Sequence, residues 1–329
     1  MTSLVWRQYR AQAAVAVALL AAAAAVILAD GLQIASHWHS ILLACAGNSA
    51  CLQQQPPLVN GVVSDLPYLS LIVPAVLGML WGAPLVAHEL EARTSDFAWT
   101  QSVTRTRWLT VKAGWLLLAA AAACGGAIAA LTTWWSGPTN AQSASVFDPG
   151  HFDTQGIVPI GYAVFAMALG IAAGTVARRT LPAIAVALGG FIAVRLVISD
   201  FVRPHYMAAV TTYYNVTGSF TPPGAAWVFS QGAVSKTGQV VPAGWGELEP
   251  ALPASCQKLL PVNGGPVPKS GSPLSAVFSC MQAHGWRGFA TYQPASRYWP
   301  FQGIETGIYV LLAAALIGVT FVIVRRRDA

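Results

Sequence analysis

The sequence predicts an all-α polytopic membrane protein with six transmembrane helices. Three observations predict this class. The chain is 55% hydrophobic and only 9% charged, whereas about 25% of the residues of an ordinary soluble domain are charged. Six stretches reach the roughly 20 apolar residues that a helix needs to cross a bilayer core. The Lys and Arg residues gather in short segments at alternate ends of these stretches, as the positive-inside rule requires.

The predicted spans are residues 13–35, 67–87, 109–135, 157–177, 181–201 and 304–324. The first stretch is too long for a cleavable signal peptide and has no clear small-residue cleavage site, so we expect it to be retained. Residues 4–10 (Leu-Val-Trp-Arg-Gln-Tyr-Arg) combine aromatic and basic side chains that favour a membrane interface. They indicate either an amphipathic N-terminal lead-in helix or an ordinary flank of the first span.

The fourth and fifth predicted spans are expected to form a tight hairpin. Little more than residues 178–180 (Arg-Arg-Thr) separates them. Residues 170–174 (Gly-Ile-Ala-Ala-Gly) give the fourth span a face of small residues spaced four apart, which permits close approach of another helix or of another subunit.

The basic excess belongs to the membrane surface rather than to nucleic-acid binding. The net charge is +6 and the isoelectric point is about 9.2, but most of the basic residues flank the spans, including the run 325–327. If basic ends are cytoplasmic, both termini are cytoplasmic. The predicted organisation is then 1–202 with five spans and a cytoplasmic segment at 88–108, an extracytoplasmic cap at 203–303, and a last span with a basic tail at 304–329.

The long segment 203–303 is predicted to be folded, because disordered segments are poor in aromatic residues and this one is rich in them. Residues 227–234 and 239–241 flank Ser-Lys-Thr-Gly, which predicts a β-hairpin. Residues 274–284 predict a short helix. The aromatic residues are Trp227, Phe229, Trp245, Phe278, Trp286, Phe289, Tyr292, Trp299 and Phe301.

The cysteines predict two disulfides in an oxidising compartment. Cys45 and Cys51 fall in the first outer loop, and Cys256 and Cys280 fall in the last one. Even numbers of cysteines in segments outside the cytoplasm favour bridges. Pairing within each loop is the favoured arrangement, with crossed pairing and free thiols as the alternatives. Cys124 lies within the third span and is expected to be free.

Ionisable residues within spans are functional candidates, because burying a charge in a bilayer is costly. Asp30, Arg195, Asp200 and Glu305 lie near the outer ends of the first, fifth and last spans. An ion pair from Arg195 to Asp30 or to Glu305 is one prediction. The alternative is that each charged side chain extends separately to the nearby interface.

The sequence offers no grouping for catalysis or metal binding. It contains no Gly-Lys dipeptide, so it lacks the P-loop of an ATPase, and it has no dinucleotide fingerprint. His88 and Glu89 begin like a zinc-protease helix, but Ala92 stands where the second histidine is needed. His37 and His39 have no third ligand nearby in the sequence. We therefore expect no enzymatic activity, cofactor or metal in this chain.

The cytoplasmic segment 88–108 has the composition of a docking surface. Glu89, Glu91 and Arg93 are charged, whereas Trp99 and its neighbours are apolar. Such a mixed surface suits a soluble partner. The alternative is a solvated loop with one side against the lipid.

Several pieces of the sequence, taken in order, resemble the membrane subunits of ATP-binding-cassette exporters of the second type, in the form common in actinobacteria. The resemblance covers nearly the whole chain, although no single piece is as specific as a Walker motif. Besides residues 4–10, the pieces are 81–91 (Trp-Gly-Ala-Pro-Leu-Val-Ala-His-Glu-Leu-Glu), 98–108, 147–150 (Phe-Asp-Pro-Gly), 178–182 (Arg-Arg-Thr-Leu-Pro), 202–206 (Val-Arg-Pro-His-Tyr) and 298–307 (Tyr-Trp-Pro-Phe-Gln-Gly-Ile-Glu-Thr-Gly).

This resemblance implies a permease in the bacterial plasma membrane that exports a small or lipophilic compound. It implies a homodimer or heterodimer of six-span subunits bound to two copies of a separate cytoplasmic ATPase subunit. The coupling helix of the family would lie in 89–108, with Glu89, Glu91, Arg93 and Trp99 at the ATPase contact. The alternative is a membrane-anchored sensor or immunity protein whose outer cap binds a ligand without transport.

Overall fold

The computed structural model describes most of the second half of the chain and parts of the first. The described residues are 18, 25, 40–41, 43–45, 51, 73–76, 78–84, 87, 105–126, 145–217, 225–242, 249–259 and 273–326. Asp30 and the predicted coupling residues Glu89, Glu91, Arg93 and Trp99 lie outside them. So do the lead-in segment 4–10 and most of the first predicted span.

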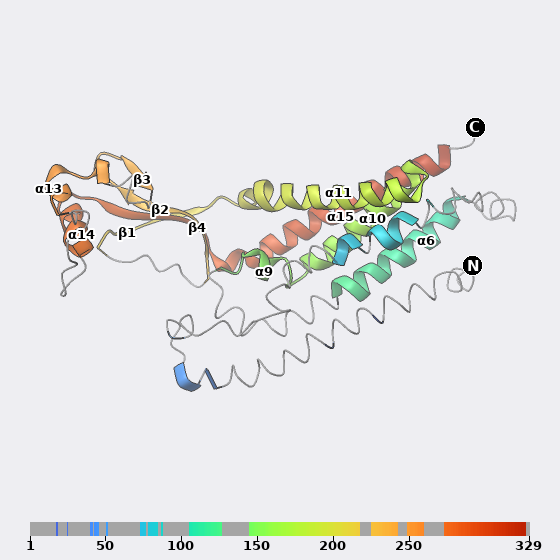
Figure 1. The fold of residues 1–329 in the computed structure, drawn as a ribbon, viewed down its shortest axis with the longest axis horizontal. Helices are drawn as coiled ribbons and strands as arrows, with labels where there is room; N and C mark the ends of the chain where they lie inside the picture. Colours follow the sequence, from blue (N-terminus) through green and yellow to red (C-terminus); the bar gives the residue numbers. More distant parts are fainter. Residues whose placement is uncertain are drawn as a thin grey trace. The chain divides into compact units, whose positions relative to one another are not determined.

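The described residues form two compact units (Figure 1). The first, which we call the helical unit, contains Asp148–Tyr206, Tyr298–Ala329 and the described residues before Ser143. The second, which we call the sheet unit, contains Ala144–Phe147 and Met207–Arg297. The fold is therefore mostly helical with a small antiparallel sheet, so the expected all-α class was incomplete.

Three helices among the described residues are long and apolar enough to cross a membrane. They span Val158–Ala177, Thr180–His205 and Ala295–Arg326, at the fourth, fifth and last predicted spans. Two shorter apolar helices, Val73–Gly82 and Leu109–Ala122, lie at the second and third. The predicted second and third spans, 67–87 and 109–135, extend beyond the described residues, so the count of six spans stays a prediction.

These helices contain several kinds of turn. The first long helix is α10 (Val158–Ala177). The second consists of α11 (Thr180–Val197), the π-helical turn η4 (Ile198–Val202) and the 3₁₀ turn η5 (Arg203–His205). The third joins the 3₁₀ turn η6 (Ala295–Arg297) to α15 (Tyr298–Arg326). Before them lie η2 (Gly78–Gly82), α6 (Arg105–Ala119), η3 (Ala120–Gly126) and α9 (Pro149–Phe152).

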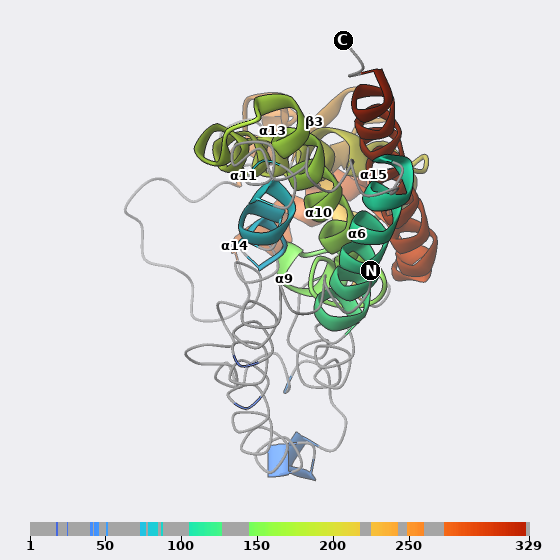
Figure 2. The same cartoon turned by 90° about the vertical axis from the view of Figure 1, so that its right-hand side faces the viewer.

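Helix α10 is the centre of the helical unit. Within the most apolar 18 residues of α10, 72% are buried, whereas the corresponding share is 28% for the helix Thr180–His205 and 22% for the helix Ala295–Arg326. Helices α6, α11 and α15 all pack against it (Figure 2). The apolar side chains that α11 and α15 leave exposed, such as Leu181 and Leu311, suit contact with lipid.

The hairpin predicted between the fourth and fifth spans is confirmed. Arg178 ends α10 in a left-handed conformation (φ 54°), and its backbone N–H donates to the Gly174 carbonyl. Arg179 is extended, and α11 begins at Thr180. The left-handed residue closes the end of α10 and reverses the chain.

The small-residue face of α10 packs within the same chain. A side chain at Gly170 would meet the Gly78 carbonyl and, at 2.9 Å, the Cα atom of Gly82. A side chain at Gly174 would meet the Ala83 carbonyl. Residues 170–174 therefore bring two backbones together inside one subunit, where only glycine leaves enough room.

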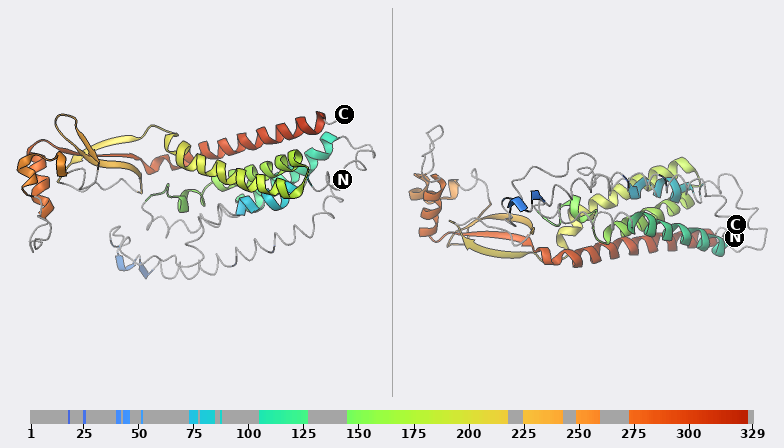
Figure 3. Two further views of the ribbon diagram at one scale, coloured as in Figure 1. Left: turned by 45° about the horizontal axis from the view of Figure 1, so that its top comes forward. Right: turned by 90° about the horizontal axis from the view of Figure 1, so that it is seen from below.

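The sheet unit holds four antiparallel strands in the order β1-β4-β2-β3. Figure 3 shows the ribbon of this unit from two further directions. They are β1 (Val210–Asn215), β2 (Trp227–Val234), β3 (Val240–Pro242) and β4 (Arg287–Gln293). The β2–β3 pair confirms the predicted hairpin, and α14 (Pro273–Ala283) confirms the predicted short helix. With α13 (Ala254–Gln257), α14 builds a core that includes Cys256, Val277, Met281 and Trp286.

We expect Gly170→Ala to lower the thermal unfolding midpoint of the purified protein. The added methyl group would meet backbone atoms that cannot move aside, and overpacking of this kind typically costs about 1–3 kcal/mol. Gly189→Ala is the matched control, because nothing lies within 4 Å of a side chain at that helical position. Equal midpoints for the two variants would contradict the packing described for α10.

Candidate functional site: a buried charge cluster

Four charged side chains and a tyrosine are buried together where α10 begins, α11 ends and α15 begins. They are Asp153, Tyr162, Arg195, Arg203 and Glu305, and each is at most 5% exposed. We call these five residues the charge cluster. Two arginines face two carboxylates, so the formal charges cancel. Isolated charges would be very costly at such depth, and the cluster is buried only because its members are paired.

Glu305 and Arg203 form the best-aligned pair of the cluster. Glu305 accepts from Arg203 through both carboxylate oxygens, at 2.8 Å from Nε and 2.8 Å from Nη2. This two-point geometry makes an arginine–carboxylate pair both strong and specific in direction. Glu305 also accepts from the Tyr162 hydroxyl at 2.6 Å and from the Tyr206 hydroxyl at 3.2 Å.

Asp153 joins the two arginines. Its Oδ2 atom lies 2.7 Å from Nη2 of Arg195, and its Oδ1 atom lies 2.6 Å from Nη2 of Arg203. Tyr162 also donates to Oδ1 at 3.0 Å. Arg195 completes the ring with a longer contact of 3.6 Å from Nη1 to Glu305. Both Nε and Nη2 of Arg203 therefore donate to carboxylates, whereas the Nε atom of Arg195 is buried without a hydrogen-bond partner among the described residues.

Aromatic rings cover the arginines. The Arg195 guanidinium lies 4.0 Å from the centre of the Tyr162 ring, and that of Arg203 lies 4.4 Å from the centre of the Phe152 ring. Tyr309 packs edge-on against Tyr162 at 4.8 Å. A cation over a ring face is attracted to it, most strongly when water is excluded. The rings thus stabilise the charges and exclude water.

The turn that carries Asp153 is held by Gln302, one turn before Glu305 on α15. The Gln302 side-chain oxygen accepts from the backbone N–H groups of Ile157 and Val158, each at 3.0 Å, and its NH₂ group donates to the Phe152 carbonyl at 2.8 Å. It thereby satisfies N–H groups at the start of α10 that have no partner inside that helix. Gly156, with φ of +74°, leaves the space for this amide.

The π-helical turn η4 positions the second arginine. In a regular α-helix, residues eight apart differ in direction by about 80°. A π-helical turn uses more residues per revolution, so η4 reduces this difference between Arg195 and Arg203. Both guanidinium groups reach Asp153 as a result.

Electrostatics outside the membrane-spanning helices agree with this pairing. Burial alone would raise the pKa of Asp153, but the charges of Arg195 and Arg203 outweigh it and hold the pKa below its usual value. Burial, followed by the nearby Glu305 carboxylate, raises the pKa of Tyr206. Asp153 is therefore a carboxylate, and Tyr206 a neutral donor, at neutral pH.

The sequence identified only part of this cluster. The structure pairs Arg195 with Glu305, as one of the sequence alternatives had it, and buries Arg195 rather than leaving it at an interface. Asp200 is exposed and accepts from Ser199 at 3.0 Å, apart from the cluster. Asp153 and Arg203 were missed because they fall in predicted loops. The signal that could have found Arg203 is the resemblance of residues 202–206 and 298–307 to the exporter family, because these two pieces contain Arg203 and Glu305, which meet in the cluster.

The charge cluster is suited to holding helices in place rather than to chemistry on a substrate. Its carboxylates are neutralised by arginine, so they are poor bases, and it contains no serine, cysteine or histidine nucleophile. Removing one partner of a buried ion pair typically costs about 3–5 kcal/mol, because the other charge is left uncompensated. The cluster therefore couples the ends of α10, α11 and α15 tightly.

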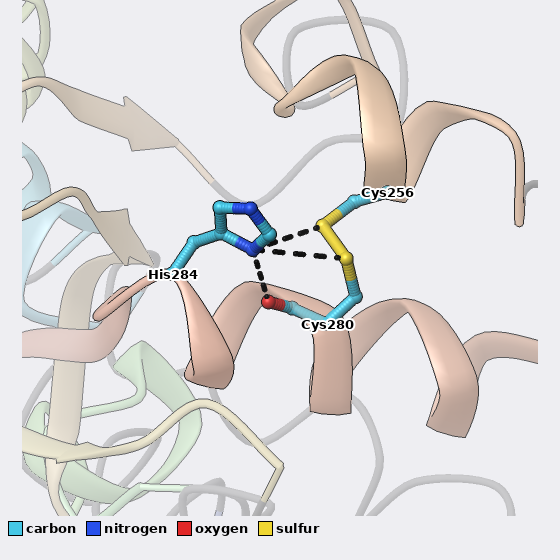
Figure 4. Close-up of side chains that lie close together, drawn as sticks. All are labelled: Cys256, Cys280 and His284. Carbon is cyan, nitrogen blue, oxygen red and sulfur yellow. Dashed lines mark hydrogen bonds between the residues drawn. A yellow bond between two sulfur atoms is a disulfide. The ribbon is translucent and has the colours of Figure 1, made fainter.

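The other group with potential ligand atoms lies in the sheet unit. Cys256 and Cys280 form a disulfide between α13 and α14, and His284 lies beside it (Figure 4). The Nδ1 atom of His284 is 3.8 Å and 3.9 Å from the two sulfurs and 2.9 Å from the Cys280 carbonyl. A metal would need thiolates, and here each sulfur is bonded to the other. In this state the group staples two helices.

The structure also places the remaining predicted cysteines. Cys45 and Cys51 form a second disulfide, so each bridge joins cysteines of one predicted loop. Cys124 lies in η3, and its side chain is outside the described part of the structure.

The comparisons with known proteins identify the class. The sequence model of a family described as ABC-2 membrane transporter related matches residues 17–203, which is more than half of the chain. The chain belongs to this family of transporter-related membrane proteins. The match contains four members of the charge cluster and ends at Arg203, whereas Glu305 lies beyond it. A search of curated proteins and a search of solved structures each found no match.

We expect Glu305→Gln to destabilise the purified protein by about 3–5 kcal/mol, because Arg203 would lose one of its two carboxylate partners and the buried cluster would keep one uncompensated positive charge. The measurement is the thermal unfolding midpoint in detergent. Asp200→Asn, which removes an exposed carboxylate, should leave the midpoint within error of the parent protein.

A double variant provides a second measurement on the same pair. Replacing both partners, with Glu305→Gln and Arg203→Met, should cost less than the sum of the two single changes, because neither charge is then left alone. Strict additivity would show that the two side chains do not interact as described.

We also expect the protein to lose stability as the pH falls from about 6.5 towards 4. Burial lowers the pKa of His151 in α9 from 6.5 to about 4. In that window the unfolded chain binds a proton that the folded chain does not, so acidification favours unfolding. His151→Phe should show a smaller loss of thermal midpoint between pH 7 and pH 5. An equal loss in both proteins would exclude His151 as the cause.

Proposed function

We propose that this protein is the permease subunit of an ATP-binding-cassette exporter, in its actinobacterial form, and that it moves a small or lipophilic compound out of the cell. The family match to residues 17–203 carries the proposal. The apolar helices Val158–Ala177, Thr180–His205 and Ala295–Arg326 support it, since a permease needs a membrane-spanning bundle.

The energy would come from a separate cytoplasmic ATPase subunit in two copies, bound to a homodimer or heterodimer of permeases. The chain itself has no P-loop, so hydrolysis is assigned to the partner. ATP binding would close the ATPase pair and push on the segment 89–108. The charge cluster would make the ends of α10, α11 and α15 respond as one body, because separating them breaks buried ion pairs.

The orientation we propose is a multi-pass protein of the bacterial plasma membrane with both termini in the cytoplasm. Two observations support it. Helices α10 and α15 start at the same end of the helical unit, where Gln302 binds the first turn of α10. Their other ends carry Arg178, Arg179, Arg325 and Arg326, which favours that side as cytoplasmic. Residues 203–303 would then be extracytoplasmic.

We expect Trp99→Ala to reduce co-purification of the ATPase subunit more than Glu91→Ala does. A buried aromatic anchor can contribute about 2 kcal/mol or more to an interface, whereas a charge at the rim mainly affects association rate and specificity. The measurement is the amount of ATPase bound to each permease variant in detergent, together with ATP hydrolysis by the complex.

A second test is a variant with Glu89, Glu91 and Arg93 all replaced by alanine, which should reduce hydrolysis while the protein still inserts in the membrane. Normal ATPase binding and hydrolysis in both this variant and Trp99→Ala would refute the coupling assignment. A sensor or immunity protein that binds a ligand without transport would then be the better proposal. The cavity in the sheet unit that Lys236 and Arg287 line is the observation that favours this second candidate.

A further inference from the structure

The sheet unit contains a cavity of about 700 Å³. Ligand-binding clefts in proteins commonly measure roughly 300–1,000 Å³, so a small organic molecule fits this one. Strands β1, β2 and β4 meet α14 at the cavity. Its lining includes Tyr213, Asn215, Lys236, Gly285, Trp286 and Arg287.

The cavity is positively charged. Among the residues that the structure describes, Lys236 and Arg287 are the charged residues of the lining, and no described Asp or Glu lines it. Within the part of the chain that the structure describes, neither cation forms an ion pair with a carboxylate. Two uncompensated cations facing one concavity attract an anion and favour its retention.

Lys236 is held in place by the turn between β2 and β3. The backbone N–H of Ser235 donates to the Gln239 carbonyl at 2.9 Å, and the backbone N–H of Gly238 donates to the Ser235 carbonyl at 3.0 Å. The aliphatic part of Lys236 then lies over Gly285, where a side chain would stand only 2.9 Å from its Cδ atom. Gly285 thus provides the space that directs the lysine.

Arg287 approaches from the first residue of β4, the strand between β1 and β2. It is paired in register with Asn215 on one side and with Val234 on the other. Asn215 adds a polar side chain to the lining beside the guanidinium. The two cations therefore come from two separately fixed elements, a hydrogen-bonded turn and a central strand.

Aromatic side chains complete the lining. Tyr213 is 60% exposed, although it is large and apolar, and Trp286 is packed into the core of the sheet unit at 5% exposure. An exposed ring beside a cavity provides a surface on which a planar or apolar group can stack. The lining thus combines a site for negative charge with a site for a ring.

We propose that this cavity binds a small organic anion in which a phosphate or carboxylate group is attached to an aromatic body. Lys236 and Arg287 bind the oxyanion, Arg287 with its planar set of donors, and Tyr213 stacks on the ring. The inference does not require transport, because it concerns binding to the sheet unit itself.

The test is calorimetric titration of the purified full-length protein, in uncharged detergent, with phenyl phosphate as the probe. We expect saturable binding that weakens as salt is added. Phenol, which lacks the phosphate, should bind at least about tenfold more weakly, since a hydrogen-bonded charged group is worth roughly that factor. Inorganic phosphate, which lacks the ring, should bind several-fold more weakly, because it cannot stack on Tyr213. Inorganic phosphate binding as tightly as phenyl phosphate would overturn the aromatic part of the proposal.

Variants assign the binding to this cavity. Lys236→Met and Arg287→Met should each weaken binding of phenyl phosphate about tenfold. Lys258→Met is the matched control, because Lys258 is an exposed lysine of the same unit that does not line the cavity, and it should bind as the parent protein does. Unchanged binding in the double variant of Lys236 and Arg287 would overturn the proposal.

A measurement on the unaltered protein removes any question of misfolded variants. Phenyl phosphate should slow acetylation of Lys236 by acetic anhydride, read by mass spectrometry of the peptides, without slowing acetylation of Lys258. Equal protection of both lysines, or of neither, would show that the probe does not occupy the cavity. Because these experiments contain no ATPase, their failure would leave the proposed transport function unaffected.

Discussion

The pair between Glu305 and Arg203 is the interaction on which the helical unit depends. Both side chains are almost completely buried, and neither could remain there alone, because an uncompensated charge in such surroundings is very costly. Their two-point geometry specifies the direction from which α15 meets the end of the second long helix. Asp153, Arg195 and Tyr162 extend the same constraint to the start of α10 and the end of α11.

The helical unit combines two kinds of contact with different mechanical properties. At the charge cluster, separation of helices breaks directional hydrogen bonds between ions. Along the small-residue face of α10, the contact with the segment 78–83 is close packing of backbones around Gly170 and Gly174, which contains no ion pair. If the protein changes shape during transport as proposed, the cluster would be the part that resists separation, and the glycine face would be the part where one helix shifts against another at lower cost.

The sheet unit is stabilised in a different way, because it has its own apolar core and a disulfide inside it. The bridge joins α13 to α14 and so closes the segment 256–280. Among the described residues of the sheet unit, Glu249 is the one acidic residue, and it does not line the cavity that contains Lys236 and Arg287. Two neighbouring positive charges without a carboxylate between them lower stability because they repel each other, but they favour binding of an anion.

The sequence by itself determined the features that depend on neighbouring residues. Apolar runs predicted the three long helices, residues 178–180 predicted the hairpin between α10 and α11, and turn residues predicted the β2–β3 hairpin and α14. These follow from local composition, since helix length in a membrane and turn geometry are decided within a few residues. The same reasoning named Arg195 and Glu305 as unusual charges in apolar surroundings.

Only the tertiary structure decided which charges meet. Arg203 lies 50 residues from Asp153 and 102 residues from Glu305 along the chain, and no local pattern indicates that these positions are neighbours. Asp153 and Arg203 lie just outside the predicted spans, so in the sequence they resemble ordinary loop residues. Their burial follows from the packing of α15 across the ends of α10 and α11, together with the π-helical turn that directs Arg203. The cavity of the sheet unit is likewise formed only when β4 pairs between β1 and β2.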